Sequence, residues 1–332
     1  MHRPGKYPAG AYLRQKRGTR MSQKCIGIDI GGTTVKIGVF TTEGTLLEKW
    51  EVPTRKEEGG AYILGDIAAS IKEKTAQWNM PQSDFVGAGM GLPGPVEPGG
   101  HIPFCVNLGW KEGNPQEELS ALLGMPVKSG NDANVAALGE MWQGGGRGYK
   151  DLVMVTLGTG VGGGIILNEQ IWPGVKGVAG EIGHMHVMED EKEQCNCGGY
   201  GCLEQAASAT GIARVASRML AAEETPSTLR ALETITAKDV LDAAKAGDEL
   251  ALAAVNKAMR YLGWAMASIT MVVDPQAYII GGGVSKAGTF LTDMIQKYHD
   301  VMSPMSTKKA KVVLAELGND AGIYGAARLI LG

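Results

Sequence analysis

Apolar residues recur along the chain with two different spacings, and glycine-rich stretches separate the segments. Short apolar runs predict strands over residues 25–30, 35–41, 46–52, 85–90, 127–129, 152–157, 164–167, 277–280 and 311–317. Helical spacing predicts helices over residues 61–78, 115–123, 212–221, 237–246, 249–273 and 321–331, and one more that opens at residues 131–132. The later part of the chain is therefore mostly helical.

Two stretches, 27–40 and 153–167, share one arrangement: a strand, a glycine-rich turn with threonine, and a second strand. Each lies near the start of one half of the chain, so we expect the two turns to face each other across a cleft. Backbone N–H groups in such turns bind anions, and glycine lets a phosphate approach the main chain. The Walker sequence and the dinucleotide fingerprint are both absent. Two ordinary hairpins are the alternative interpretation.

A carboxylate and a cation accompany the first turn, and they favour a nucleotide site over ordinary hairpins. Asp29 stands at the end of the first strand, where it can hold Mg²⁺ directly or through water. Lys36 can meet the charge of a phosphate.

The stretch that begins Asn131-Asp132-Ala-Asn and ends at Glu140 carries a carboxylate at a strand-to-helix junction. A sugar hydroxyl that attacks a phosphoryl group needs a base to accept its proton. Asp132 is the candidate base, and Asn131 is the candidate for orienting the sugar. Simple capping of the helix is the alternative, because Asn and Asp are common at helix starts.

The densest signal is a cluster of thiols behind two histidines. Cys195, Cys197 and Cys202 stand in a C-x-C-x4-C spacing, and His184 lies eleven residues upstream of the first. Three thiolates and one histidine make a closed, structural zinc site, with His186 as the rival fourth ligand. Polar side chains suited to sugar hydroxyl groups bracket the cluster: Glu181, His184 and Glu204.

Composition limits the class of protein. The chain has 332 residues, of which 44% are hydrophobic and 20% charged, enough for a packed core and two lobes. It has no run of about 18 apolar residues and no apolar block near its start, so we expect a cytoplasmic protein without a membrane partner. The formal net charge of -3 gives no general attraction to nucleic acid. Residues 1–21 form a basic stretch that predicts a disordered extension, with contact to nucleic acid as a second interpretation.

Taken together, these motifs resemble the ROK family of bacterial sugar kinases and repressors, most closely its ATP-dependent glucokinases of Gram-positive bacteria. Residues 29–36 are similar to the family's first phosphate motif and residues 157–164 to its second. Residues 181–184 and 195–204 are similar to its sugar-and-zinc signature. The resemblance covers residues 22–332 and leaves the basic arm unmatched.

The resemblance implies an actin-like ATPase, ribonuclease H-like fold, with two α/β lobes and a cleft that closes on sugar. The small lobe would comprise residues 22–132 plus 318–332, and the large lobe residues 133–317 with the zinc-binding loop. It also implies a homo-oligomer, either a dimer or a tetramer.

By the same resemblance Asp132 is the catalytic base, and His184 rather than His186 both ligates zinc and touches the sugar. The implied sugar-binding residues are Asn107, Asn131, Asp132, Glu181, His184 and Glu204. The implied nucleotide-binding residues are Asp29, Gly31, Gly32, Thr33, Thr34, Lys36, Gly158, Thr159, Gly160, Gly281, Gly282 and Gly283. The implied zinc ligands are His184, Cys195, Cys197 and Cys202.

The activity implied is transfer of the γ-phosphoryl group of ATP to the 6-hydroxyl of glucose, with Mg²⁺ as cofactor and Zn²⁺ as a structural ion. A kinase for N-acetylmannosamine, N-acetylglucosamine, mannose or fructose is the nearest alternative. A ROK repressor is less favoured, because its helix-turn-helix domain would have to precede a first strand that begins at Cys25. A purely structural actin-like protein is disfavoured by Asp132 and the thiol cluster together.

Overall fold

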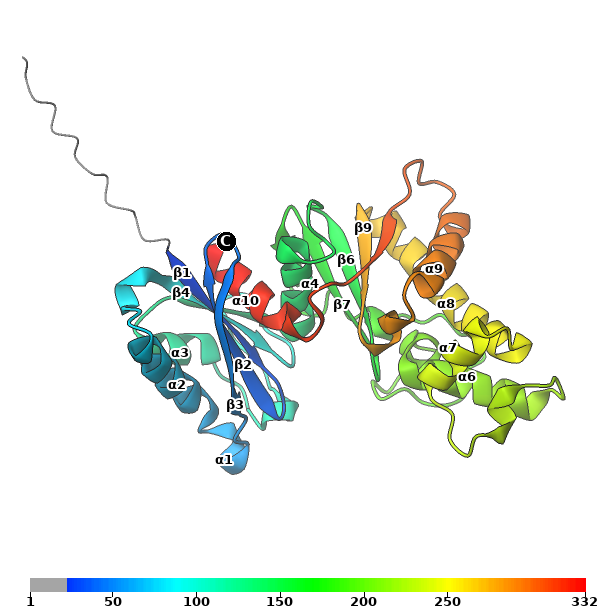
Figure 1. The fold of residues 1–332 in the computed structure, drawn as a ribbon, viewed down its shortest axis with the longest axis horizontal. Helices are drawn as coiled ribbons and strands as arrows, with labels where there is room; N and C mark the ends of the chain where they lie inside the picture. Colours follow the sequence, from blue (N-terminus) through cyan, green and yellow to red (C-terminus); the bar gives the residue numbers. More distant parts are fainter. Residues whose placement is uncertain (1–22) are drawn as a thin grey trace, which may run out of the picture.

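The computed structural model describes residues 23–332, so the extension predicted over residues 1–21 lies outside the described part of the chain. The described residues form two five-stranded sheets, with a pair of helices between them (Figure 1). Each sheet is covered on its outer side by further helices. Each sheet therefore has helices on both of its faces, and both faces are buried.

The first sheet has the strand order β3-β2-β1-β4-β5. Its first three strands are antiparallel, and β4 and β5 extend it in parallel from β1. The bounds are Lys24–Ile30 for β1, Thr34–Thr41 for β2, Leu46–Pro53 for β3, Phe85–Leu92 for β4 and Val127–Asn131 for β5.

The second sheet repeats this topology with the order β8-β7-β6-β9-β10, because β6 to β8 are antiparallel and β9 and β10 extend the sheet in parallel from β6. The repeated strand, turn and strand arrangement seen in the sequence is thus the start of each sheet. The bounds are Leu152–Leu157 for β6, Val161–Leu167 for β7, Gln170–Ile171 for β8, Ala277–Gly281 for β9 and Lys311–Leu314 for β10.

Helices α2 and α3 pack on the first sheet, α8 and α9 pack on the second, and α6 and α7 pack against α8. Side chains of Asn114, Asn131, Ser208, Thr236 and Asp248 cap the N-termini of α3, α4, α6, α7 and α8. The bounds are Glu57–Gly60 for α1, Ile63–Gln77 for α2, Pro115–Leu123 for α3, Asp132–Gln143 for α4, Glu204–Ala207 for α5, Ala209–Ala222 for α6, Ala237–Lys245 for α7, Glu249–Val273 for α8, Thr289–Met302 for α9 and Ala321–Leu331 for α10.

Among the elements that differ from the sequence expectation are α9 and β10. The pattern gave no element over α9, although Leu291, Ile295 and His299 recur there at a spacing of four and are buried. The strand expected over residues 311–317 ends at Leu314 as β10, because the N–H groups of Glu316 and Leu317 turn toward a side chain instead. Within residues 23–332 no helix is both long and apolar enough to span a membrane.

Helix α10 is packed backbone to backbone against its neighbours. It lies on β1 and β4 and along α4, between the two sheets. A methyl group on Gly27 of β1 would overlap the carbonyl oxygen of Ile323, and one on Gly325 of α10 would overlap that of Val135 on α4. Only glycine permits so close an approach. The predicted division into lobes of 22–132 plus 318–332 and 133–317 stays a prediction.

We expect Gly325→Ala to destabilise the protein by about 1–3 kcal/mol, the usual cost of overpacking a filled core. Gly65→Ala on α2 is the matched control, because a methyl group there meets no atom within 4 Å. Because Gly65 is exposed on α2, the same substitution there should instead stabilise the protein by about 0.5–1 kcal/mol. Urea unfolding of both variants measures the difference, and equal stability of the two would contradict the packing described.

Candidate active site

A cavity of about 840 Å³ lies between the sheets, and elements of both line it. Asp29 of β1, Lys36 of β2 and Asp132 of α4 come from the first sheet and the helix that follows it. The stretch Gly281 to Gly283, after β9, lines the same cavity from the second sheet. The structure therefore brings the candidate base, the candidate magnesium ligand and the third glycine run together.

Asp132 is the first residue of α4 and is fixed by that helix. One of its carboxylate oxygens accepts the N–H of Ala133 at 2.8 Å. Burial raises the pKa of Asp132 to about 6; the Ala133 hydrogen bond opposes this rise, and the carboxylates of Asp29 and Glu181 add to it. A carboxyl with this pKa is still mainly ionised at neutral pH, yet it holds a proton better than an exposed aspartate does.

Asn131 is the N-cap of α4. Its Oδ1 accepts the N–H groups of Ala133 and Asn134 at 3.0 and 3.2 Å, and its Nδ2 donates to Gly94 O at 3.1 Å. The capping interpretation of Asn131 is therefore correct. Its role toward a sugar stays a prediction.

Asp29 and Lys36 face each other across the β1–β2 pair. Burial raises the pKa of Asp29, and the positive charge of Lys36 partly offsets that effect. The Lys36 ammonium donates to Asn319 O at 2.8 Å, in the segment before α10. A β-carbon on Gly91 would lie 3.7 Å from both Asp29 Oδ1 and Asp132 Cα, so the two acids flank one point of β4.

The two glycine-rich turns, residues 31–34 and 158–160, are ordered by their own hydrogen bonds. Gly31 N–H donates to Thr34 O at 3.1 Å, and Gly158 N–H donates to Gly160 O at 3.0 Å. The cavity wall, as the described residues form it, does not include these turns. Contact of Gly31, Gly32, Thr33, Thr34, Gly158, Thr159 and Gly160 with a nucleotide stays a prediction.

Glu204 and His184 lie together beside the second turn, and Glu181 lies near the candidate base. Glu204 begins α5, and its carboxylate lies 3.9 Å from Nδ1 of His184. A β-carbon on Gly160 would lie 2.6 Å from Glu204 Oε2. Glu181 is close enough to Asp132 for its charge to raise the pKa of that acid. These residues thus connect the second turn to the candidate base.

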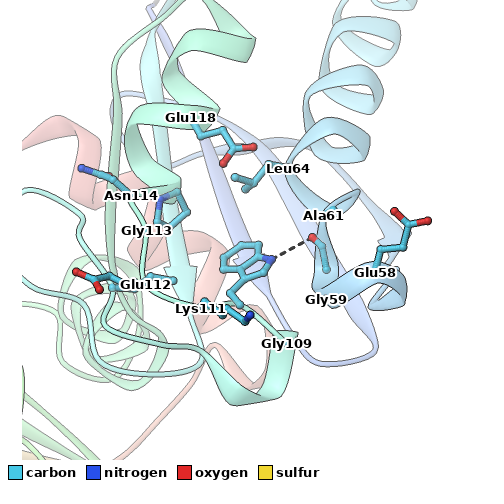
Figure 2. Close-up of a pocket in the computed structure, with 14 residues that line it drawn as sticks. Glu58, Gly59, Ala61, Leu64, Gly109, Lys111, Glu112, Gly113, Asn114 and Glu118 are labelled. Atoms are coloured by element: carbon cyan, nitrogen blue, oxygen red, sulfur yellow. Dashed lines mark hydrogen bonds between the residues drawn. The ribbon is translucent and has the colours of Figure 1, made fainter.

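Asn107 is exposed and lies in a short 3-10 helix, Val106–Leu108, within the loop between β4 and α3. Trp110 anchors the loop, because its indole N–H donates to Gly60 O at 3.0 Å, beside a cavity of about 350 Å³ (Figure 2). A β-carbon on Gly32 would lie 3.9 Å from Asn107 O, which places the loop against the first turn. Contact between Asn107 and a sugar stays a prediction.

The thiol cluster has the geometry of a metal site. Ligand atoms of His184, Cys195, Cys197 and Cys202 all lie within 4.8 Å of one another. The Cys197 and Cys202 sulfurs are 3.6 Å apart, and Cys195 Sγ is 3.8 Å from His184 Nδ1. Tetrahedral zinc at about 2.3 Å from thiolates places neighbouring sulfurs about 3.8 Å apart, so the residues fit zinc.

His186 is turned away from this cluster. Its Nδ1 lies 2.8 Å from the carbonyl oxygen of Tyr200, and its ligand atoms are outside the group of four. The choice of His184 over His186 therefore agrees with the geometry.

Comparison with known proteins decides the family. The sequence profile of the ROK family matches residues 25–332. The chain belongs to the ROK family. A glucokinase of Halalkalibacterium halodurans is 44% identical over 312 residues, which cover 92% of this chain and 94% of that protein.

Solved structures agree with this assignment. A ROK family glucokinase of Streptomyces griseus, in complex with glucose and AMPPNP, has a TM-score of 0.69 at 34% identity and covers 92% of this chain and 98% of its own. A ROK hexokinase of Thermus thermophilus has a TM-score of 0.76 at 29% identity, with 92% and 97% covered. The predicted actin-like, ribonuclease H-like fold is confirmed.

A second pocket of this ROK protein, a cavity of about 400 Å³ beside Gly283, was not predicted from the sequence. Ala237 and Leu241 of α7 and Val284 form its apolar part, and Lys238, Lys286 and Lys245 stand at its rim. In the sequence, α7 shows only ordinary amphipathic spacing after a Thr236 cap, and nothing there points to a ligand.

The loop that carries the thiol cluster of this ROK protein is also held by ion pairs. Arg214 donates to Glu193 at 2.9 Å, and Arg218 donates to Glu191 at 2.8 and 3.0 Å. The hydrogen bond from Arg218 lowers the pKa of Glu191 to about 2. The loop therefore stays attached to α6 by contacts that need no metal.

We expect Cys197→Ala to lose most of its zinc, because three remaining ligands bind the ion more weakly than four. The control is Cys25→Ala, which removes a buried thiol of β1 outside the cluster. Elemental analysis should find stoichiometric zinc in the parent protein and in the control. Unchanged zinc in Cys197→Ala would rule out the cluster as the metal site.

Proposed function

We propose that this ROK family protein is an ATP-dependent glucokinase, which transfers the γ-phosphoryl group of ATP to the 6-hydroxyl of glucose. The observation that carries the proposal is a partly buried carboxylate, Asp132, whose pKa is raised to about 6 in a cavity that it shares with Asp29. The H. halodurans relative is named glucokinase, and the S. griseus structure contains glucose with an ATP analogue.

Asp132 acts as the general base. As the new bond to phosphorus forms, the attacking hydroxyl releases its proton to the carboxylate, which must be ionised beforehand. The raised pKa supports this role, because a carboxylate of pKa about 6 accepts a proton more readily than one near 4 and is still ionised at neutral pH. Helix α4 supplies the fixed orientation.

Groups from the first sheet and from residues 281–283 would stabilise the negative charge on the phosphoryl oxygens. Asp29 would hold Mg²⁺, which supplies positive charge beside the phosphates when it is bound. Lys36 lies next to Asp29 in the cavity and adds a fixed cation. Gly281, Gly282 and Gly283 line the same cavity from the second sheet, where backbone N–H groups would bind phosphate oxygens.

The apolar pocket between α7 and Gly283 suits an adenine base. It opens next to the glycine run that lines the main cavity, because Gly283 belongs to the walls of both. A nucleotide with its base against Ala237 and Leu241 would therefore extend its phosphates toward Asp29. Lys238 and Lys286 stand beside this path.

The zinc site serves recognition rather than chemistry. Its four ligands leave no open position for water, so the ion braces the loop without activating a nucleophile. His184 and Glu204 are held beside the second turn by this brace, where sugar hydroxyl groups would bind. A homo-oligomeric state and a cytoplasmic location stay predictions.

We expect the parent protein to release ADP from ATP fastest with glucose among a panel of glucose, mannose, fructose, N-acetylglucosamine and N-acetylmannosamine. Asp132→Asn should lower kcat by about a hundredfold to ten-thousandfold, the usual worth of a general base. Glucose binding by calorimetry should change little, because the other sugar ligands remain.

Asp66→Asn is the control for this experiment, since Asp66 lies on α2 and pairs with Arg55 at the surface. A coupled ADP assay measures all three proteins. Near-parental kcat in Asp132→Asn would remove Asp132 from the role of base, and faster turnover of another hexose would reassign the substrate.

A further inference from the structure

Glu140 ends the sequence stretch that begins at Asn131, and the proposed chemistry leaves it without a role. It lies near the end of α4, and it is fully buried. Its Oε2 accepts the N–H groups of Gly145 and Glu316 at 3.0 and 2.9 Å, and its Oε1 accepts that of Leu317 at 2.9 Å. No ion pair among residues 23–332 includes it.

These three N–H groups belong to two connections between the sheets, here called the crossings. Residues 144–151 lead from α4 to β6, and residues 315–320 lead from β10 back to α10. One buried carboxylate therefore joins both crossings. Any change in the angle between the sheets must alter the backbone within residues 132–151 or residues 315–320, because the described chain passes between the two sheets only there.

The returning segment, residues 315–320, is also tied to the proposed active site. Lys36 donates to Asn319 O at 2.8 Å, and Lys49 pairs with Asp320 at 2.7 Å. Glu316 and Asn319 line the same cavity as Asp132. The helix that carries Glu140 begins at Asp132, about 12 Å away at 1.5 Å per residue.

We propose that Glu140 is a positioning residue that fixes the angle between the two sheets, and so aligns Asp132 and Asp29 with groups bound by the second sheet. Helix α4 transmits this alignment, because the base stands at one of its ends and the hydrogen-bonded crossings at the other. This inference rests on the proposed kinase activity for its kinetic test, but not for its structural one.

Glu140→Gln tests the proposal with a nearly isosteric side chain. The amide has one acceptor oxygen for three N–H donors, so its NH₂ group must face at least one of them, and the remaining bonds lose their ionic character. Asp248→Asn is the matched control. Asp248 also accepts backbone N–H groups, from Thr228 at 2.7 Å and Ala251 at 3.0 Å, but it joins segments on one sheet only.

Kinetics are measured well below the unfolding temperature of the variant. We expect Glu140→Gln to lower kcat about tenfold or more and to change KM for glucose less than threefold. Three of the six proposed sugar ligands, Glu181, His184 and Glu204, follow β7 of the second sheet, so part of the binding should persist while alignment is lost. Asp248→Asn should lower the unfolding temperature and leave kcat within twofold. A kcat for Glu140→Gln within twofold of the parent, or an equal loss in Asp248→Asn, would overturn the inference while leaving the kinase proposal intact.

Small-angle scattering without ligand supplies the structural test and needs no activity. We expect a larger radius of gyration for Glu140→Gln than for the parent, and an unchanged radius for Asp248→Asn. If the parent protein fails to phosphorylate glucose, the kinase proposal is wrong and scattering alone tests the role of Glu140. Equal radii of gyration for Glu140→Gln and the parent would overturn that role.

Discussion

The backbone contact of α10 with β1, β4 and α4 is the constraint on which the site depends. At Gly27 and Gly325 the main chains meet so closely that a β-carbon would overlap a carbonyl oxygen. This contact brings the end of β1, which carries Asp29, beside the start of α4, which carries Asp132. The two acids come from distant parts of the sequence, and this packing places them in one cavity wall.

The same packing explains the electrostatics. Burial is the largest cause of the raised pKa of both Asp29 and Asp132, and the charge of Asp29 raises the pKa of Asp132 further. The Ala133 N–H at the start of α4 stabilises the ionised form of Asp132 and so partly offsets the rise in its pKa. The two acids thus differ in their local partners: Lys36 faces Asp29, the candidate cation ligand, and the N-terminus of α4 holds Asp132, the candidate base.

Local sequence patterns predicted the parts of this structure that depend on short-range chemistry. The two strand, turn and strand segments became the starts of two matching sheets, and the thiol spacing became a compact four-ligand cluster. Spacing alone could not decide whether His184 or His186 is the fourth ligand. In the structure His186 Nδ1 lies beside the carbonyl oxygen of Tyr200, a contact that the sequence does not predict. The pairing of Lys36 with Asn319 and the pocket beside α7 were likewise missed, since they arise only when segments far apart in sequence pack together.

A structure of the protein with glucose and a non-hydrolysable ATP analogue tests the central claim most directly, through one distance. We expect a carboxylate oxygen of Asp132 about 2.6–3.2 Å from the 6-hydroxyl oxygen of glucose, on the side away from the leaving phosphate. A sugar whose 6-hydroxyl is held by Asp29 or Glu181, with Asp132 outside hydrogen-bonding distance, would contradict the account.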